Sequence, residues 1–302
     1  MSGAWPSLPF EVWQDTYATL HMWMQVVGKI RLEQTPLVNH WWNVTLYVTP
    51  HGLTTGTMPH GNEAFRIDFD FVDHRLEIAT SRGGAFSTAL EPRTVADFHE
   101  VVMGGLEKLG MPVEIWTKPM EVEIAIPFEK DQEHAAYDPD AAHRLWRILV
   151  QCDRVFGEFR SLFVGKCSPA HFFWGAFDMA ITRFSGRNAP DHPGAPFVAR
   201  WVAREAYSHE CSSCGFWPGG GPVPEPVFYA YAYPEPAGFR EWPVAPKAAY
   251  YSTDLFEYLL PYEAVRRADD PDAALLGFMQ STYEAAAELG GWDRKALERY
   301  PR

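Results

Sequence analysis

The sequence predicts an α+β fold with two pseudo-repeated halves, each a long helix plus antiparallel strands, with the helices packed on the sheets. Three observations predict it. Two long segments carry apolar residues at helical spacing, several short segments alternate apolar and polar residues, and one helix-then-strand unit occurs twice. The halves are expected over residues 1–133 and 134–302, together forming one compact unit.

Long helices are predicted near the start of each half. In the first half, Trp13 and Tyr17 share one helix face and belong to a predicted helix over residues 9–33. In the second half, Asp138 suits an N-cap and Pro139 suits the first helical position, so a helix is expected to begin there. Start and stop signals of the same kind predict further helices over residues 94–110 and 270–290.

Alternating residues predict the strands. Phe65, Ile67 and Phe69 face one way, while the polar residues between them face the other. This pattern of half-buried antiparallel strands marks the segments 40–49, 64–71, 76–80, 113–116, 122–126, 171–183 and 226–233. The second half also contains an inserted loop, residues 186–225, whose Gly-, Pro- and Ser-rich part is predicted to be mobile and functional.

Both halves open their first strand with similar residues. His40-Trp41-Trp42 follows the first long helix, and His171-Phe172-Phe173 follows the second at a matching distance. This agreement favours an internal duplication, in which both histidines begin core faces and are structural residues. In the alternative, a pseudo-twofold axis brings His40 and His171 together in one shared site or a two-histidine metal site.

Charge and composition exclude several classes of function. The net charge is −13 and the pI is near 5.3, and lysine and arginine do not cluster, so neither nucleic acid nor an anionic membrane is an expected partner. A signal peptide and an apolar stretch of about 18 residues are both missing, which favours a cytoplasmic protein. Four cysteines do not make a disulfide scaffold.

The polar faces of the predicted strands suggest a ligand pocket. Asn43 and Tyr47 occupy the same offsets in the first half as Trp174 and Asp178 in the second. If these strands share a sheet, hydrogen-bonding groups and an aromatic wall lie together, as in most small-molecule pockets. Two further residues are predicted to line it, Arg183 as a partner for a carboxylate or phosphate and Tyr231 as part of a tyrosine ladder.

The inserted loop carries the predicted catalytic pair, His209 and Glu210. A histidine beside a carboxylate can transfer protons near neutral pH, and a loop present in only one half suits a lid that closes the pocket. The competing interpretation is that the pair caps the preceding helix or holds the loop in place.

No cofactor is predicted, although zinc is a minor alternative. Cys211 and Cys214 form one CxxC pair with His209 nearby, whereas tetrahedral zinc needs four such ligands. The other minor metal site is the histidine pair His40 and His171.

Several motifs resemble an uncharacterised bacterial family, the domain of unknown function 5996. They are the run His171 to Arg187, Ser208-His209-Glu210 with Gly215 to Gly219, and the run Phe228 to Phe239. The resemblance covers nearly the whole chain, but it implies no activity and no catalytic residues.

Two functions therefore remain open from the sequence. The first is an enzyme acting on a small polar or aromatic metabolite in an aromatic-lined pocket closed by the His209-Glu210 loop. The second is a non-catalytic module that binds a small molecule or another protein through the same aromatic residues.

Overall fold

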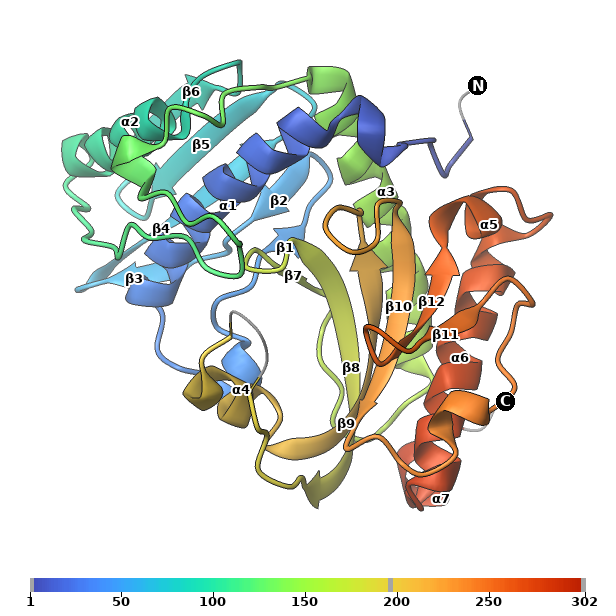
Figure 1. Cartoon of the computed structure of the whole chain (residues 1–302). Coiled ribbons are helices and arrows are strands. Elements are labelled where there is room, and N and C mark those ends of the chain that lie inside the picture. Colours follow the sequence, from blue (N-terminus) through green and yellow to red (C-terminus); the bar gives the residue numbers. More distant parts are fainter. Residues whose placement is uncertain (1–2, 195–197, 300–302) are drawn as a thin grey trace.

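Two antiparallel sheets of six strands each, with seven α-helices, make up the part of the chain that the computed structural model describes, residues 3–194 and 198–299. Figure 1 shows the long helices packed against the strands, so the predicted α+β class is confirmed. The helices are α1 Gln14–Gln34, α2 Val95–Lys108, α3 Pro139–Ser161, α4 Arg200–Ala206, α5 Tyr262–Arg266, α6 Pro271–Leu289 and α7 Arg294–Leu297.

The first sheet is largely an antiparallel meander with the strand order β1-β2-β4-β5-β6, and β3 also pairs with β4. Phe65, Ile67 and Phe69 of β4 are buried, as their alternation predicts. The strands are β1 Tyr47–Val48, β2 Gly52–Thr54, β3 Met58–His60, β4 Glu63–Asp70, β5 Arg75–Thr80 and β6 Ala85–Ala89.

The second sheet has the strand order β11-β12-β10-β9-β8-β7. Helix α6 packs against β9 and β10, and α3 packs against β8, so both helices cover one face (Figure 1). The strands are β7 His171–Phe173, β8 Asp178–Asn188, β9 His209–Trp217, β10 Val227–Tyr233, β11 Tyr250–Ser252 and β12 Glu257–Pro261.

Local capping explains where the helices begin. The Asp138 side chain accepts hydrogen bonds from the backbone N–H groups of Asp140 and Ala141, and Pro139 occupies the first helical position. Asp270 caps α6 in the same way, and Thr94 caps α2. Each of these predicted helices is confirmed. Within the described ranges, none of the helices combines the length and the apolar composition that crossing a membrane requires.

Three predicted strands are wrong. Residues 113–116 and 122–126 form no strand, and the first-half strand shrinks to Tyr47–Val48. His40 and Trp41 both have φ near 60°, which is incompatible with an extended chain, and His40 lies in a short 3-10 helix. The structure therefore does not show the predicted duplication, because His171 begins a strand and His40 does not.

The predicted loop over residues 186–225, which was to close the pocket as a lid at His209-Glu210, is also wrong where the structure describes it, and residues 195–197 of that prediction lie outside the described residues. His209–Trp217 forms β9, which pairs with β8 on one side and β10 on the other. Residues of this central strand are buried on both faces of the sheet, so they need not alternate between apolar and polar. The segment therefore has the composition of a loop although it lies inside a sheet.

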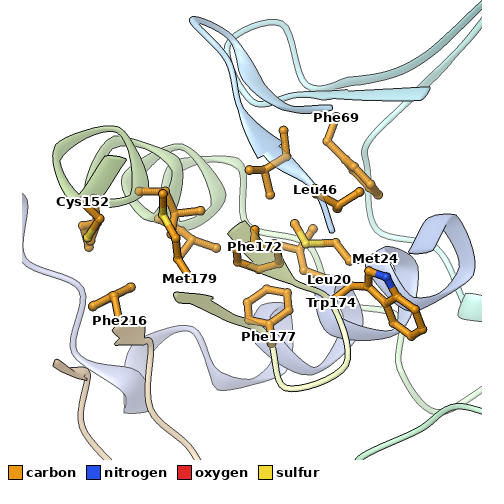
Figure 2. Packing of buried hydrophobic residues seen from close by; sticks show 14 of the residues in the cluster. Leu20, Met24, Leu46, Phe69, Cys152, Phe172, Trp174, Phe177, Met179 and Phe216 are labelled. Carbon is orange, nitrogen blue, oxygen red and sulfur yellow. The ribbon is translucent and has the colours of Figure 1, made fainter. Parts of the chain in front are cut away.

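One continuous core joins the two sheets. Leu46 and Phe172 form an isolated antiparallel bridge, with backbone N–O distances of 2.9 Å in both directions. Figure 2 shows apolar side chains running from Phe69 past this bridge to Met179 and Phe216. The sheets are thus held at a fixed junction, and residues of both halves meet there.

Candidate functional site

The two faces of the second sheet have different side chains. The helix-covered face contains Met179, Ile181, Cys214 and Phe216, which belong to the main core. The opposite face, here called the open face, contains small and polar residues beside tyrosines: Asp178, Ala180, Thr182, Ser213, Gly215, Tyr229, Tyr231 and Glu257. In Figure 1, α4 lies on the side of the open face.

Carboxyl groups and tyrosines gather on and above the open face. We call the group Glu121, Asp178, Tyr207, Tyr229, Tyr231 and Glu257 the acidic tyrosine pocket. Asp178 is at its centre, because the charge of Asp178 acts on both Glu121 and Glu257.

Asp178 is held by a tyrosine from two strands away. Its Oδ2 accepts a hydrogen bond from the Tyr229 hydroxyl. Tyr229 crosses over Gly215 of the intervening strand, where a Cβ atom would lie 2.4 Å from the hydroxyl. Burial raises the pKa of Asp178 to about 6, even though the bond from Tyr229 opposes the shift.

Glu121 reaches the pocket from an irregular segment that is fixed by α1. The buried Gln25 side chain donates to the Met120 carbonyl at 2.7 Å and accepts from the Met120 N–H at 2.8 Å. Glu121 itself has φ 55°, a left-handed conformation that costs free energy unless the surroundings impose it. A Cβ at Gly175 would lie 2.2 Å from Glu121 Oε1, so the carboxyl rests against that backbone.

The Glu121 carboxyl is close to other protein atoms although the residue is exposed. Desolvation by surrounding protein and the charge of Asp178 raise its pKa to about 7. Glu257 on β12 behaves similarly, with a pKa raised to about 8 by burial first and by Asp178 second. Water reaches both groups, but protein restricts its access.

A hollow of about 620 Å³ opens next to Glu257. The hydroxyls of Tyr207 and Tyr231 are 2.9 Å apart at its wall, and the Tyr229 and Tyr231 rings stack with a centroid separation of 6.1 Å. Its lining is His192, Tyr207, Tyr231, Ala232, Tyr233, Glu235, Arg240, Leu255, Phe256 and Glu257. The volume suits a small metabolite.

The carboxyl groups of the pocket lack basic partners. Across residues 3–194 and 198–299, no lysine, arginine or histidine forms an ion pair with Glu121, Asp178 or Glu257. Arg240 lines the hollow, but it pairs with Glu235 at 2.6 Å. The three carboxyl groups thus have no compensating positive charge in the described part of the chain.

Asn43 and Trp174 are structural. The Asn43 side chain accepts from the Val38 N–H at 3.2 Å and donates to Thr35, which fixes the bend after α1. The Trp174 indole donates to the Val44 carbonyl at 2.8 Å and packs against Gly28. Both residues are about 5% exposed or less, so the prediction that they line a pocket is wrong.

Arg183 does not bind ligand from the open face, because its side chain points to the helix-covered face. The guanidinium lies 3.4 Å from the Phe159 ring centroid and 4.3 Å from that of Tyr283. It donates to the Phe159 carbonyl, and only 1% of the residue is exposed. A soluble carboxylate or phosphate cannot reach it, so the predicted role is wrong.

His209 and Glu210 begin a strand instead of forming a lid. Glu210 Oε2 accepts from Arg187 Nη2 at 2.6 Å and from Ser185 Oγ at 2.9 Å. His209 Nδ1 lies 3.1 Å from Ser208 Oγ. These bonds join β9 to the bulged end of β8, which matches the competing interpretation that the pair holds the chain in place.

The zinc alternative fails on strand geometry. Cys211 and Cys214 are three residues apart in β9, so their side chains point to opposite faces of the sheet. Within the described ranges, no three His, Cys, Asp or Glu side chains gather closely enough to hold a metal ion. His40 and His171 both contact Trp42, at centroid separations of 5.4 and 5.7 Å, and their ring nitrogens have different partners, Ala206 and Lys166 for His40 and Tyr47 for His171.

Tyr47 lies at the junction of the sheets. Its hydroxyl is 3.4 Å from His171 Nε2 and also interacts with Arg31. Burial and the positive charge of Arg31 lower the pKa of His171 to about 3, so this histidine is neutral. Of the predicted binding residues, Asp178 and Tyr231 share the acidic tyrosine pocket, whereas Tyr47 lies at the β7 end of the sheet.

A larger hollow of about 810 Å³ lies beside α2. Its acidic residues Asp97, Glu100, Glu107 and Glu129 are exposed, and the pKa of Glu129 is below its ordinary value. Carboxyl groups that are hydrated in this way need no ligand. The acidic tyrosine pocket is therefore the better candidate site.

Sequence patterns do not identify three key members of the pocket. Glu121 lies in an irregular segment whose position depends on the bonds between Gln25 and Met120, which are 95 residues apart. Glu257 is the acidic first residue of a short apolar strand, which is the only signal it gives. Tyr207 follows α4 with no motif of its own.

The chain belongs to the Family of unknown function (DUF5996), which it matches over residues 5–299. No curated protein and no solved structure matches it.

Proposed function

We propose that the acidic tyrosine pocket binds a small organic cation and that its carboxyl groups exchange protons with that ligand. One observation carries this proposal. Glu121, Asp178 and Glu257 have pKa values raised to about 7, 6 and 8, and no basic side chain among the described residues forms an ion pair with them.

The chemistry of such a pocket selects a positive charge. An ammonium or guanidinium group supplies the missing counter-charge, and the faces of Tyr229 and Tyr231 favour cations through their ring electrons. Binding of a cation lowers the carboxyl pKa values, so protons are released when the complex forms. Groups that titrate between pH 6 and 8 are also suited to general acid–base catalysis at neutral pH.

The binding experiment compares ligands that differ in charge. Isothermal titration calorimetry with n-butylammonium, tetramethylammonium and the uncharged 1-pentanol is carried out between pH 6 and pH 8.5. We expect both cations to bind, to bind more tightly as pH rises, and to release protons. The alcohol should bind at least about tenfold more weakly, a difference of about 1.4 kcal/mol.

Matched variants locate the binding. Glu257→Gln should weaken butylammonium binding at pH 8.5 by about tenfold or more, because one buried counter-charge is lost. Glu129→Gln, in the hollow beside α2, removes the same charge elsewhere and should leave binding unchanged. Equal binding of cation and alcohol, or equal weakening in both variants, contradicts the proposal.

The same measurement separates acid–base chemistry from simple binding. Titrations in two buffers of different ionisation enthalpy give the number of protons released. A non-zero release that Glu121→Gln reduces supports proton exchange. Tight binding without proton release favours a non-catalytic binding module.

A further inference from the structure

Lys166 lies at the other end of the open face, in an extended segment beside β8. Its carbonyl accepts from the Phe184 N–H at 3.0 Å, and the Ser168 N–H donates to the Thr182 carbonyl at 2.9 Å. Cys167, between them, forms a backbone β-bridge with Arg183, and its side chain interacts with the Arg183 side chain on the helix-covered face. Alternation along this segment places the Lys166 side chain on the opposite side, toward the open face.

Aromatic rings and a histidine surround the amine. Lys166 Nζ is 5.3 Å from the Trp42 ring centroid, 4.9 Å from that of Phe184 and 2.6 Å from His40 Nε2. Lys166 forms no ion pair within the described ranges. The nearest acid is Glu205, which accepts from the His40 backbone N–H at 3.2 Å and acts on Lys166 only at longer range.

The contact with His40 has a defined direction. His40 Nδ1 lies 2.9 Å from the Ala206 carbonyl, which can only accept, so Nδ1 carries the proton. The Nε2 lone pair is therefore free to accept from Lys166. His40 Nε2 is in a position to receive a proton from the ammonium.

The lysine is partly withdrawn from water. Burial lowers the pKa of Lys166, whereas the more distant Glu205 opposes this change. Burial, first, and Lys166 and His209 lower the pKa of His40 and keep its ring available as an acceptor. The lysines at positions 108, 118, 130, 247 and 295 are exposed and have ordinary hydrated surroundings.

We infer that Lys166 is a reactive amine that forms an imine with the carbonyl group of an aldehyde or ketone, with His40 as proton acceptor. Phe184 and Trp42 hold the amine in a semi-apolar cage, and the hydroxyls of Thr182 and Ser213, 2.9 Å apart, continue the open face beyond it. This site is distinct from the acidic tyrosine pocket and does not depend on its proposed ligand.

The reaction needs no reagent besides the carbonyl compound. His40 Nε2 takes a proton from the Lys166 ammonium, and the amine lone pair forms a bond to the carbonyl carbon. The carbonyl oxygen takes up that proton, then leaves as water with a second proton from the nitrogen, and an iminium forms. One ammonium and one carbonyl thus give one iminium and one water, with charge conserved.

Reductive trapping tests the inference within one protein. The full chain is incubated at pH 7 with propionaldehyde and sodium cyanoborohydride, which reduces the iminium to a stable propyl-lysine, and each lysine is quantified by peptide mass spectrometry. We expect the alkylated fraction at Lys166 to exceed that at Lys118 and Lys247 by at least about tenfold. A half-buried lysine with only a structural role would react more slowly than those exposed residues, and that result overturns the inference.

A variant tests the role of the histidine. His40→Gln should lower trapping at Lys166 at pH 7 and shift its pH profile upward, because the amide does not accept the proton. His60→Gln, on β3, should change neither. Unchanged trapping in His40→Gln removes His40 from the mechanism, and the comparison among lysines in the unmodified chain stands whether or not this variant folds.

Discussion

Arg183 and Asp178 lie on the same strand, β8, but on opposite faces of the second sheet. The Arg183 cation is enclosed by Phe159 and Tyr283 and donates to a carbonyl, so no ligand can reach it. The Asp178 carboxyl has Tyr229 as its partner and two further acids around it, and in the part of the chain that the structure describes it forms no ion pair. A buried charged group therefore does not by itself indicate a functional site. A buried charged group that lacks a compensating charge and lies near a hollow does indicate one.

Removing the aromatic cover of Arg183 should have the largest effect on stability. Phe159→Ala deletes a ring that is 1% exposed, and we expect it to lower the free energy of unfolding by about 3–5 kcal/mol. Urea denaturation measures this change. The matching variant on the open face, Tyr231→Phe, should change the free energy of unfolding little but weaken butylammonium binding. A large loss of stability in Tyr231→Phe, or a loss of binding in Phe159→Ala alone, would contradict the difference between the two faces.

The second-largest effect is expected in the pH dependence of stability, to which the carboxyl groups of the open face contribute. Carboxyl groups whose folded pKa is raised bind protons more tightly in the folded state, so their contribution is fully present below pH 4 and is lost as pH rises to 8. We therefore expect the unfolding midpoint to fall between pH 5 and pH 8.

The variant Glu257→Gln should make that decline shallower, because one of the protonated groups is gone. Thermal unfolding at pH 5, 6.5 and 8 measures both slopes, with Glu129→Gln as the control of equal charge. A steeper decline in Glu257→Gln than in the unmodified chain would be incompatible with a raised pKa at that residue.

A smaller effect is expected from a substitution that displaces only the Glu121 carboxyl group. In Gly175→Ala the new methyl group collides with the Glu121 side chain, which can move away, so the unfolding free energy should change by less than about 1 kcal/mol. Cation binding should nevertheless weaken, as calorimetry would show. Gly157→Ala, where the added methyl meets no atom, is the matched control, and equal binding by both variants would exclude Glu121 from the site.

The smallest effect is expected at the pair that the sequence favours for catalysis. Glu210→Gln removes a surface ion pair with Arg187, which contributes about 0–1 kcal/mol to stability. Chemical denaturation should detect little change, and butylammonium affinity should be unaltered. A large loss of binding would restore the hypothesis that His209 and Glu210 act on the ligand.

The elements that sequence patterns predict are those with local causes. Asp138 and Pro139 begin α3 through their own geometry, and Phe65 to Phe69 alternate because only one face of β4 is buried. Strand β9 has no such pattern because its residues from Cys211 to Phe216 are buried whichever face they lie on, and its pairing depends on β8 and β10. The fold class was therefore accessible from sequence, while the central strand was not.

The candidate site was only partly predictable for a related reason. Asp178 and Tyr231 stand out on alternating strands, whereas Glu121 takes its position from the side chain of Gln25 in α1. His40 shares a motif with His171, but its left-handed backbone turns it toward Lys166. Tertiary contacts of this kind leave no periodic signal in the chain.

The carboxyl groups of the open face have pKa values raised toward neutral pH. Carbon-13 NMR titration of the side-chain carboxyls, assigned with Asp178→Asn, Glu121→Gln and Glu257→Gln, tests it directly. We expect midpoints of about 6 for Asp178, 7 for Glu121 and 8 for Glu257. Midpoints near 4 for all three, the ordinary range of carboxyl groups, would contradict it.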